Sequence, residues 1–136
     1  MQEVIQITTD QQNGLYDITG LVENIVSNSK IQSGMVNVYA QGATAGIMIQ
    51  ENWDRSVQND VITLLRKLIP AGVWEHDAQD NNGDAHLKAG LVGPSETIPV
   101  INGKMGLSTW QNIFFCEFDG PRNKRSIVVS VWNSEM

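Results

Sequence analysis

The run NIFFCEF, residues 112–118, decides the fold of this chain more than any other stretch. It predicts a β-strand in which Phe114, Cys116 and Phe118 share one face, while Glu117 lies on the other face among apolar neighbours. The tetrapeptide DGPR, residues 119–122, predicts a turn, and residues 126–132 predict the strand that closes the domain. The last third of the chain is therefore expected to be β-structure.

The preceding segment predicts a β-hairpin. Residues 97–101 and 104–108 flank Asn102-Gly103, a pair whose left-handed backbone preference suits the tightest hairpin turns. Further strands are expected at residues 4–8, 35–40 and 47–49, and Ser33-Gly34 is expected to form a turn before the second of these.

Helices are predicted at three places. Asp17 or Thr19 can cap a short helix whose apolar face holds Leu21, Val22, Ile25 and Val26. Apolar side chains also recur at helical spacing over residues 56–69, before Pro70. Residues 84–92 alternate like a strand but consist of helix-forming residues, so a helix capped by Asp84 and stopped by Gly93 is expected. This element order predicts an α+β fold with a mainly antiparallel sheet and helices on its faces.

Composition limits the class of protein. The 136 residues suit one domain, residues 1–136, and a net charge of −6 argues against binding nucleic acid through its phosphates. The single Cys116 cannot form an internal disulfide. The sequence shows no signal peptide and no apolar run long enough for a membrane helix, so no membrane partner is expected and the cytoplasm is the simplest location.

The segment WEHDAQDNNGDAHLK, residues 74–88, gathers titratable groups more densely than any other part of the chain. It contains both histidines, three aspartates, a glutamate and a lysine, and it has almost no apolar side chain to bury. Such a segment either lies on the surface for solubility or converges on a ligand. The presence of both histidines favours a ligand.

A divalent metal ion is one candidate ligand. His76 and His86 are ten residues apart, which is wider than the spacing of a helical zinc motif. Asp77 and Asp84 supply the nearest carboxylate oxygens, and folding can bring in Glu51. The alternative is that the two histidines cap loops and satisfy backbone groups.

A phosphate group is the other candidate. If Asp84 caps a helix, His86 lies in the first turn, where the helix dipole attracts anions, and a neutral His86 can bind metal or donate to a phosphate oxygen. Lys88 either pairs with Asp84 four residues away or neutralises a diphosphate. In the small-residue run GATAG, residues 42–46, Thr44 and the backbone amides can approach a phosphate, although close strand or subunit packing explains the run equally well.

The remaining candidates lie in or beside predicted strands. Glu51 follows an apolar strand, so it is either a pocket residue or a solvated carboxylate. Trp110 and Gln111 offer a stacking ring and an amide to a pyrimidine, or they belong to the core or an interface. Cys116 is expected to be a buried structural thiol. The carboxylate of Glu117 needs a partner, for which Arg122, Arg125 or a threefold-related subunit are the alternatives.

Four blocks of the sequence carry a family resemblance. They are GATAG (42–46) followed by Glu51; HD (76–77) with NGDAHLKA (82–89); LVGPS (91–95); and TWQ (109–111) leading to CEFDGPR (116–122). In this order they resemble the YjbQ-like family, also called the secondary thiamine-phosphate synthase family, and Asp17-Ile18-Thr19 fits as well. Many members carry His-Thr-Thr where this chain has Gly42-Ala43-Thr44, so no role of that histidine transfers, and Thr44 is the only side-chain donor left in the block.

The resemblance implies a homotrimer of two-sheet α+β subunits with two to three helices. It also implies a weak ability to join a pyrimidine diphosphate to a thiazole phosphate, releasing pyrophosphate. Because pyrophosphate chemistry normally uses a divalent ion held by carboxylates, Mg²⁺ or Zn²⁺ is the expected cofactor. The alternatives are a metal-dependent hydrolase of a small phosphorylated metabolite and a non-catalytic trimer that binds a metabolite or metal. The hypothesis assigns catalysis to His86, Asp84, Lys88 and Glu51, substrate binding to Thr44, Trp110, Gln111 and Arg122, and metal binding to His76, His86, Asp77 and Asp84.

Overall fold

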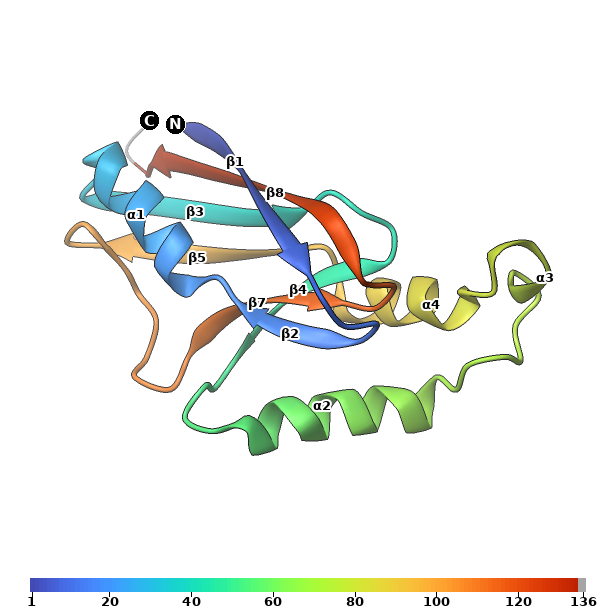
Figure 1. Ribbon diagram of the computed structural model, residues 1–136. Coiled ribbons are helices and arrows are strands. Elements are labelled where there is room, and N and C mark those ends of the chain that lie inside the picture. The colour runs from blue at the N-terminus through green and yellow to red at the C-terminus, as the bar shows by residue number, and fades with distance from the viewer. Residues whose placement is uncertain (135–136) are drawn as a thin grey trace.

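Two antiparallel sheets form the body of the molecule (Figure 1). The computed structural model describes residues 1–134. The larger sheet has the order β1-β8-β3-β5-β6 and the smaller one the order β2-β7-β4. The strands are β1 (Gln2–Thr9), β2 (Gly14–Asp17), β3 (Ser33–Ala40), β4 (Ala45–Gln50), β5 (Ser95–Ile101), β6 (Lys104–Met105), β7 (Asn112–Glu117) and β8 (Arg122–Asn133). The fold class expected from the sequence, an α+β protein of mainly antiparallel strands, is confirmed.

The predicted hairpin is present, although its second strand is shorter than expected. Asn102 and Gly103 both have positive φ, 53° and 81°, and the turn pairs Ile101 with Lys104. β6 ends at Met105, and residues 106–111 form a loop instead of continuing the strand to Ser108.

One local prediction in the first half of the chain is wrong, and one strand there was missed. Ser33 and Gly34 lie within β3 and not in a turn. The missing Cβ of Gly34 permits this, because a Cβ there would lie 2.0 Å from the Trp132 carbonyl oxygen of β8. The four-residue β2 was not predicted, because such a short segment has no alternation of its own and forms a strand only by pairing with β7.

The described residues form four helices, α1 (Thr19–Ser29), α2 (Arg55–Leu68), α3 (Asp77–Asp80) and α4 (Gly83–Val92), of which α3 is one turn long and was not predicted. Asp17 Oδ1 accepts the Thr19 N–H at 2.9 Å just before α1, but the N-cap residue is Ile18, so neither Asp17 nor Thr19 caps this helix as predicted. α4 begins at Gly83, with Asn82 as its N-cap, so Asp84 lies inside the first turn and does not cap the helix.

The two faces of β7 belong to two different cores. Ile113 and Phe115 pack between the two sheets with α1, whose buried residues are Val22, Ile25 and Val26. Cys116 and Phe118, on the opposite face, pack against α2 and α4, with Leu65 and Ala89 among the contacting residues. The smaller sheet is thus covered on both sides, which explains why β7 is apolar along nearly its whole length.

Candidate functional site

The predicted site residues lie at opposite ends of the smaller sheet. Thr44 immediately precedes β4 and Glu51 immediately follows it. A strand of six residues spans about 20 Å. Ala45 pairs with Glu117 at one end, and Gln50 pairs with Asn112 at the other. The structure therefore does not bring Glu51 together with the α4 residues, which lie at the Glu117 end.

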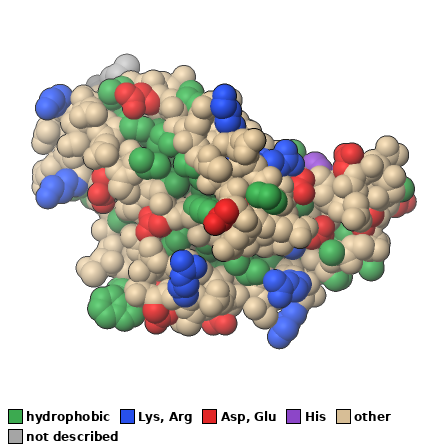
Figure 2. Space-filling model, in the orientation of Figure 1, with side chains coloured by type: hydrophobic (Ala, Val, Ile, Leu, Met, Phe, Trp, Pro, Cys, Tyr) green, Lys and Arg blue, Asp and Glu red, His purple; other side chains and the backbone are tan. Residues whose placement is uncertain are grey.

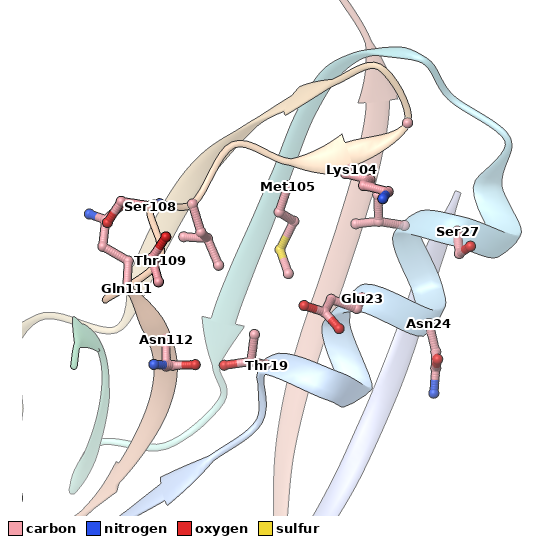
Figure 3. A pocket seen from close by; sticks show the side chains of 13 residues that line it. Thr19, Glu23, Asn24, Ser27, Lys104, Met105, Ser108, Thr109, Gln111 and Asn112 are labelled. Carbon is pink, nitrogen blue, oxygen red and sulfur yellow. The ribbon is translucent and has the colours of Figure 1, made fainter. Parts of the chain in front are cut away.

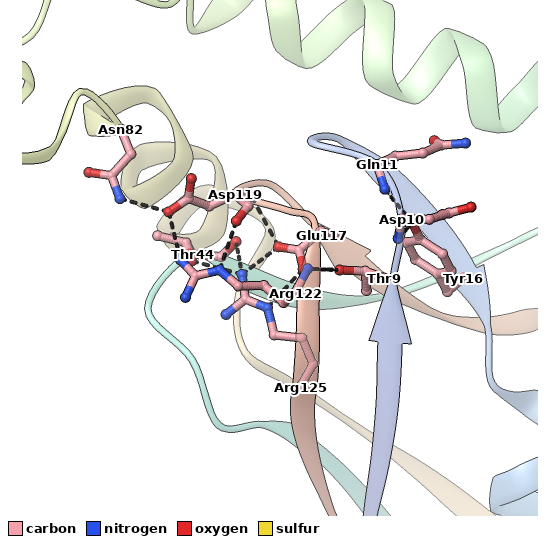
Figure 4. Close-up of polar contacts among 10 residues, drawn as sticks. All are labelled: Thr9, Asp10, Gln11, Tyr16, Thr44, Asn82, Glu117, Asp119, Arg122 and Arg125. Carbon is pink, nitrogen blue, oxygen red and sulfur yellow. Dashed lines mark hydrogen bonds and ion pairs between the residues drawn. The ribbon is translucent and has the colours of Figure 1, made fainter.

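The Arg125 cluster, which consists of Thr9, Thr44, Glu117 and Arg125, lies buried at the Glu117 end (Figure 4). The Arg125 guanidinium donates Nε–H to Glu117 Oε1 at 2.9 Å and Nη2–H to Glu117 Oε2, which is a bidentate ion pair. Nη2 also donates to Thr44 Oγ1 at 2.9 Å, and Thr9 Oγ1 donates to Glu117 Oε1 at 2.7 Å. Arg125 is therefore the partner that Glu117 needs, and Thr44 is part of the same cluster.

The environment of Glu117 favours its ionised form. Burial raises the pKa of this carboxyl, but hydrogen bonds from Arg125, Thr9 and the Asp119 N–H outweigh burial and hold the pKa below its ordinary range. Gly42 makes this arrangement possible, because a Cβ at that position would lie 2.8 Å from Arg125 Nη1.

The Asp119 bridge, which consists of Asn82, Asp119 and Arg122, joins this cluster to the start of α4. Asp119 Oδ2 accepts from Asn82 Nδ2 at 2.8 Å and from Arg122 Nη2 at 2.9 Å (Figure 4). The Arg122 backbone N–H donates to Thr9 Oγ1 at 3.0 Å, which ties the bridge to the cluster. The Arg122 side chain is 47% exposed, so its guanidinium is accessible to a ligand.

Asn82 shows an unusual feature at this bridge. Within residues 1–134, its Oδ1 is the buried side-chain atom that has no hydrogen-bond partner. Since Nδ2 of the same amide is held by Asp119, the amide orientation is fixed and Oδ1 remains an acceptor in need of a donor.

A second buried ion pair lies within α4. Lys88 Nζ donates to Asp84 Oδ2 at 3.0 Å, and the two side chains are only 5% and 9% exposed. Lys88 also donates to Asn13 Oδ1 at 3.2 Å. Of the two roles left open for Lys88, the structure shows the pairing with Asp84, since the ammonium is enclosed by its own partners.

The two imidazoles are neighbours. The ring centroids of His76 and His86 lie 4.7 Å apart with an interplanar angle of 86°, and His76 Nε2 lies 3.4 Å from Asp80 Oδ2. Figure 2 shows histidine atoms at the surface where the α3 segment leaves the body, with acidic and basic side chains beside them. The two histidines of this segment therefore lie side by side.

The predicted metal ligands are not gathered around one point. Asp77 Oδ2 accepts from the Trp74 N–H and Asp77 Oδ1 from the Gly83 N–H, and these two bonds hold the pKa of Asp77 below its ordinary range. Asp84 is engaged by Lys88. Across residues 1–134, no three His, Cys, Asp or Glu side chains are placed to hold one ion. The donor set therefore does not fit a metal held by this chain alone.

Trp110 and Gln111 lie at the opposite end, with Glu51. Trp110 is 53% exposed and meets Trp53 edge to face at 5.5 Å between ring centroids. Gln111 Oε1 accepts from the Ser108 N–H at 2.9 Å. Neither side chain reaches the Arg125 cluster, so the pyrimidine-binding role predicted for them does not belong to the α4 end.

Sequence reasoning missed four polar residues at this end: Thr9, Asn13, Asn82 and Asp119. Asn82 and Asp119 belong to the motifs NGDAHLKA and CEFDGPR, but no role was predicted for their side chains. The pairing of β1 with β8 brings Thr9 to this end, and Asn13 immediately precedes β2, which pairs with β7.

Cys116 should not react with thiol reagents in the folded protein. It is fully buried, and burial raises the pKa of its thiol to about 12, so little thiolate forms near neutral pH. We expect no modification by an aromatic disulfide reagent in native buffer and one equivalent after denaturation, measured by absorbance. Rapid modification of native protein would show that the second core opens, and a Cys116→Ala variant gives the background.

The fold and the site define a class: an antiparallel two-sheet α+β protein with paired buried ions at one end of its smaller sheet. The chain belongs to the family described as UPF0047 protein YjbQ-like, whose profile matches residues 3–134. A UPF0047 protein of Methanothermobacter thermautotrophicus is 44% identical over 128 residues, which cover 93% of this chain and 88% of that protein. The UPF0047 protein YugU of Bacillus subtilis is 39% identical over 127 residues, with coverage of 91% and 94%.

Solved structures agree with this membership. A YbjQ-like protein of unknown function from Sulfolobus solfataricus superposes with a TM-score of 0.95 at 36% identity, covering 98% of this chain and 97% of that one. An uncharacterised conserved protein of Clostridium acetobutylicum gives a TM-score of 0.91 at 40% identity, covering 96% and 99%. None of these four proteins is named for a substrate or a reaction. Within residues 1–134, no helix has the length and apolarity that crossing a bilayer requires.

Proposed function

We propose that this protein is a cytoplasmic transferase that joins a pyrimidine diphosphate to a thiazole phosphate at a low rate, releasing pyrophosphate. The candidate active site is the surface formed by Arg122, Asn82, His76 and His86. The observation that supports this proposal is the gathering of two buried ion pairs, Arg125–Glu117 and Lys88–Asp84, behind that surface. The lone buried Cys116 is compatible with a reducing compartment.

The buried pairs support a functional role because they are costly. Removing two charges from water carries a desolvation penalty that their attraction often fails to offset, so such pairs are weak evidence for stability. Here the Arg125–Glu117 pair is linked through Thr9 to the accessible Arg122, which Asp119 joins to Asn82 at the start of α4. The Lys88–Asp84 pair lies within α4 itself. We infer that they fix the positions of these groups.

The reaction requires stabilisation of a departing anion. The bond between the pyrimidine methylene carbon and the diphosphate oxygen breaks, the electron pair leaves on pyrophosphate, and the thiazole nitrogen forms the new carbon–nitrogen bond. Arg122 offers two parallel N–H donors to phosphate oxygens, and His86 offers a ring N–H to the departing oxygen.

A direct assay tests this proposal. Purified protein is mixed with the two precursors, and thiamine phosphate and pyrophosphate are measured with added Mg²⁺, with added Zn²⁺ and with a chelator. We expect Arg122→Met to lower the rate by about 10²–10³-fold, as for loss of an oxyanion donor, and His86→Ala by about 10²-fold.

Arg66→Met is the matched control, since Arg66 is exposed near the end of α2 and belongs to neither the Arg125 cluster nor the Asp119 bridge. Equal rates for wild type and Arg122→Met would refute the proposed site. Product formed from one substrate and water would instead indicate a hydrolase. Tight binding of either precursor without turnover under every metal condition would indicate a binding protein.

We also propose that the chain forms a homotrimer. Large apolar side chains are exposed on and beside α2: Trp53 is 75%, Leu64 is 55% and Leu68 is 60% exposed. Exposed apolar groups of this size indicate a surface that another chain covers. Sedimentation equilibrium should give three times the chain mass of 15.0 kDa. Replacing Leu64 and Leu68 by lysine should lower this mass, whereas a monomeric wild type would contradict the proposal.

A further inference from the structure

A cavity of about 540 Å³ lies far from the α4 end, between α1, β6 and the loop that leads to β7 (Figure 3). Its volume falls within the roughly 300–1,000 Å³ of small-molecule sites. Met105 and Leu107 provide apolar surface, and most of the remaining side chains are polar. This cavity shares no residue with the Arg125 cluster or the Asp119 bridge, so it forms a separate site.

The cavity contains two opposite charges that do not pair. Glu23 on α1 and Lys104 on β6 both line it, yet within residues 1–134 neither has an ion-pair partner within 4.0 Å or a side-chain hydrogen bond. Figure 3 shows the Glu23 carboxylate directed into the space below Met105, while Lys104 lies at the β6 end of the cavity. A ligand with an ammonium and a carboxylate can occupy the gap and pair with both.

The opposite wall of the cavity is neutral and hydrogen-bonding. Thr109 and Asn112 line it, and in the described part of the chain their side chains make no hydrogen bond to another residue. Gln111 uses its Oε1 internally, which leaves its Nε2 amide as a donor. Hydroxyl and amide groups without charge suit a polar, uncharged substituent.

We propose that this cavity binds a small zwitterion of the α-amino acid class that carries a polar uncharged side chain. The ligand ammonium pairs with Glu23, the carboxylate pairs with Lys104, the aliphatic part contacts Met105, and the side chain meets Thr109 and Asn112. This site is independent of the proposed transferase activity, so either proposal can fail without the other.

Amide-resolved NMR titration of the full chain tests the site with three probes. L-glutamine should give saturable shifts at α1 and residues 103–112, whereas glutaramate, which lacks the ammonium, and L-glutamine amide, which lacks the carboxylate, should bind more weakly. Because both charges are exposed, Glu23→Gln and Lys104→Met should each weaken L-glutamine binding by about fivefold.

The probes and variants also test each contact separately. Glu23→Gln should leave glutaramate binding unchanged, and Lys104→Met should leave binding of L-glutamine amide unchanged. A double variant, Glu23→Lys with Lys104→Glu, should bind glycine as the wild type does, since glycine has no side chain and can bind in the reverse orientation. A structural role for either charge predicts no such rescue.

Three results would overturn the proposal. The first is the absence of saturable shifts at these residues with L-glutamine. The second is equal affinity for all three probes in wild type and variants. The third is a set of shifts that depends on protein concentration without any ligand, which would show that a second copy of the chain covers the cavity.

Discussion

Replacing Arg125 by methionine should lower the free energy of unfolding by about 3–5 kcal/mol, because the change leaves a buried carboxylate without its cation. The Glu117 side chain is completely inaccessible to solvent, and the Arg125 guanidinium donates to both of its carboxylate oxygens. Methionine keeps most of the aliphatic volume, so the loss reports on charge and not on packing. Urea unfolding at neutral pH, followed by circular dichroism, measures this loss.

Two further variants test whether burial of the ion pair causes the loss of stability expected for Arg125→Met. Arg122→Met breaks an ion pair whose arginine side chain is 47% exposed, so its loss should not exceed about 1 kcal/mol. The double variant Arg125→Met/Glu117→Gln removes both buried charges and should be more stable than Arg125→Met alone. A double variant less stable than the single one would contradict this account.

The Arg125–Glu117 pair also predicts that the free energy of unfolding depends on pH. Glu117 has a folded pKa below its ordinary value of 4.5, so its ionised form stabilises the fold. This contribution is fully present above pH 4.5 and is lost as the pH falls through the lower folded pKa. The stability difference between wild type and Glu117→Gln should therefore narrow as the pH falls below 4.5. A constant difference would show that ionisation of Glu117 contributes nothing.

Gly120→Ala should destabilise the protein by about 3 kcal/mol or more, because the added methyl group has no space. A Cβ at Gly120 would lie 2.0 Å from the Gln11 carbonyl oxygen and 2.8 Å from Glu117 Cγ. The Gly120 N–H also donates to the Gln12 carbonyl oxygen at 3.1 Å, which holds the β1–β2 loop against the turn after β7. The clash is with backbone, so a change of rotamer cannot relieve it.

Gly90→Ala is the matched control for this substitution. Gly90 lies within α4, is exposed, and has no atom from outside its own stretch of helix within 4 Å of the position of an added Cβ. Alanine should therefore stabilise the helix by about 0.5–1 kcal/mol. The midpoints of thermal and urea unfolding should fall for Gly120→Ala and rise for Gly90→Ala. Similar losses in both would mean that close packing at Gly120 is not the cause.

The elements that the sequence predicted best are those with a strong local signal. The Asn102–Gly103 turn needs a backbone that these residues adopt easily, and β7 is apolar along most of its length because both its faces are buried. The elements that the sequence predicted worst are strands whose extent depends on pairing with a neighbouring strand. β2 exists because β7 lies beside it, and β6 ends where β5 no longer pairs with it.

The contacts of the candidate site also fall into those that local sequence predicts and those that depend on the packing of distant segments. The nearness of His76 to His86 and the pairing of Lys88 with Asp84 follow from short separations along the chain, so sequence reasoning could reach them. The distance of Glu51 from these residues could not be foreseen, since it depends on the direction of β4 across the sheet.

The sequence by itself determined the α+β class, the hairpin, the main helices and the family, because these depend on local backbone preference, periodicity and motif order. Only the tertiary structure decided that Arg125 pairs with Glu117, that Thr9 and Asn13 reach this site, and that a cavity with unpaired charges lies at the other end. These features join residues up to 108 positions apart. Contacts at such separations arise from the packing of strands and helices, which no short stretch of sequence specifies.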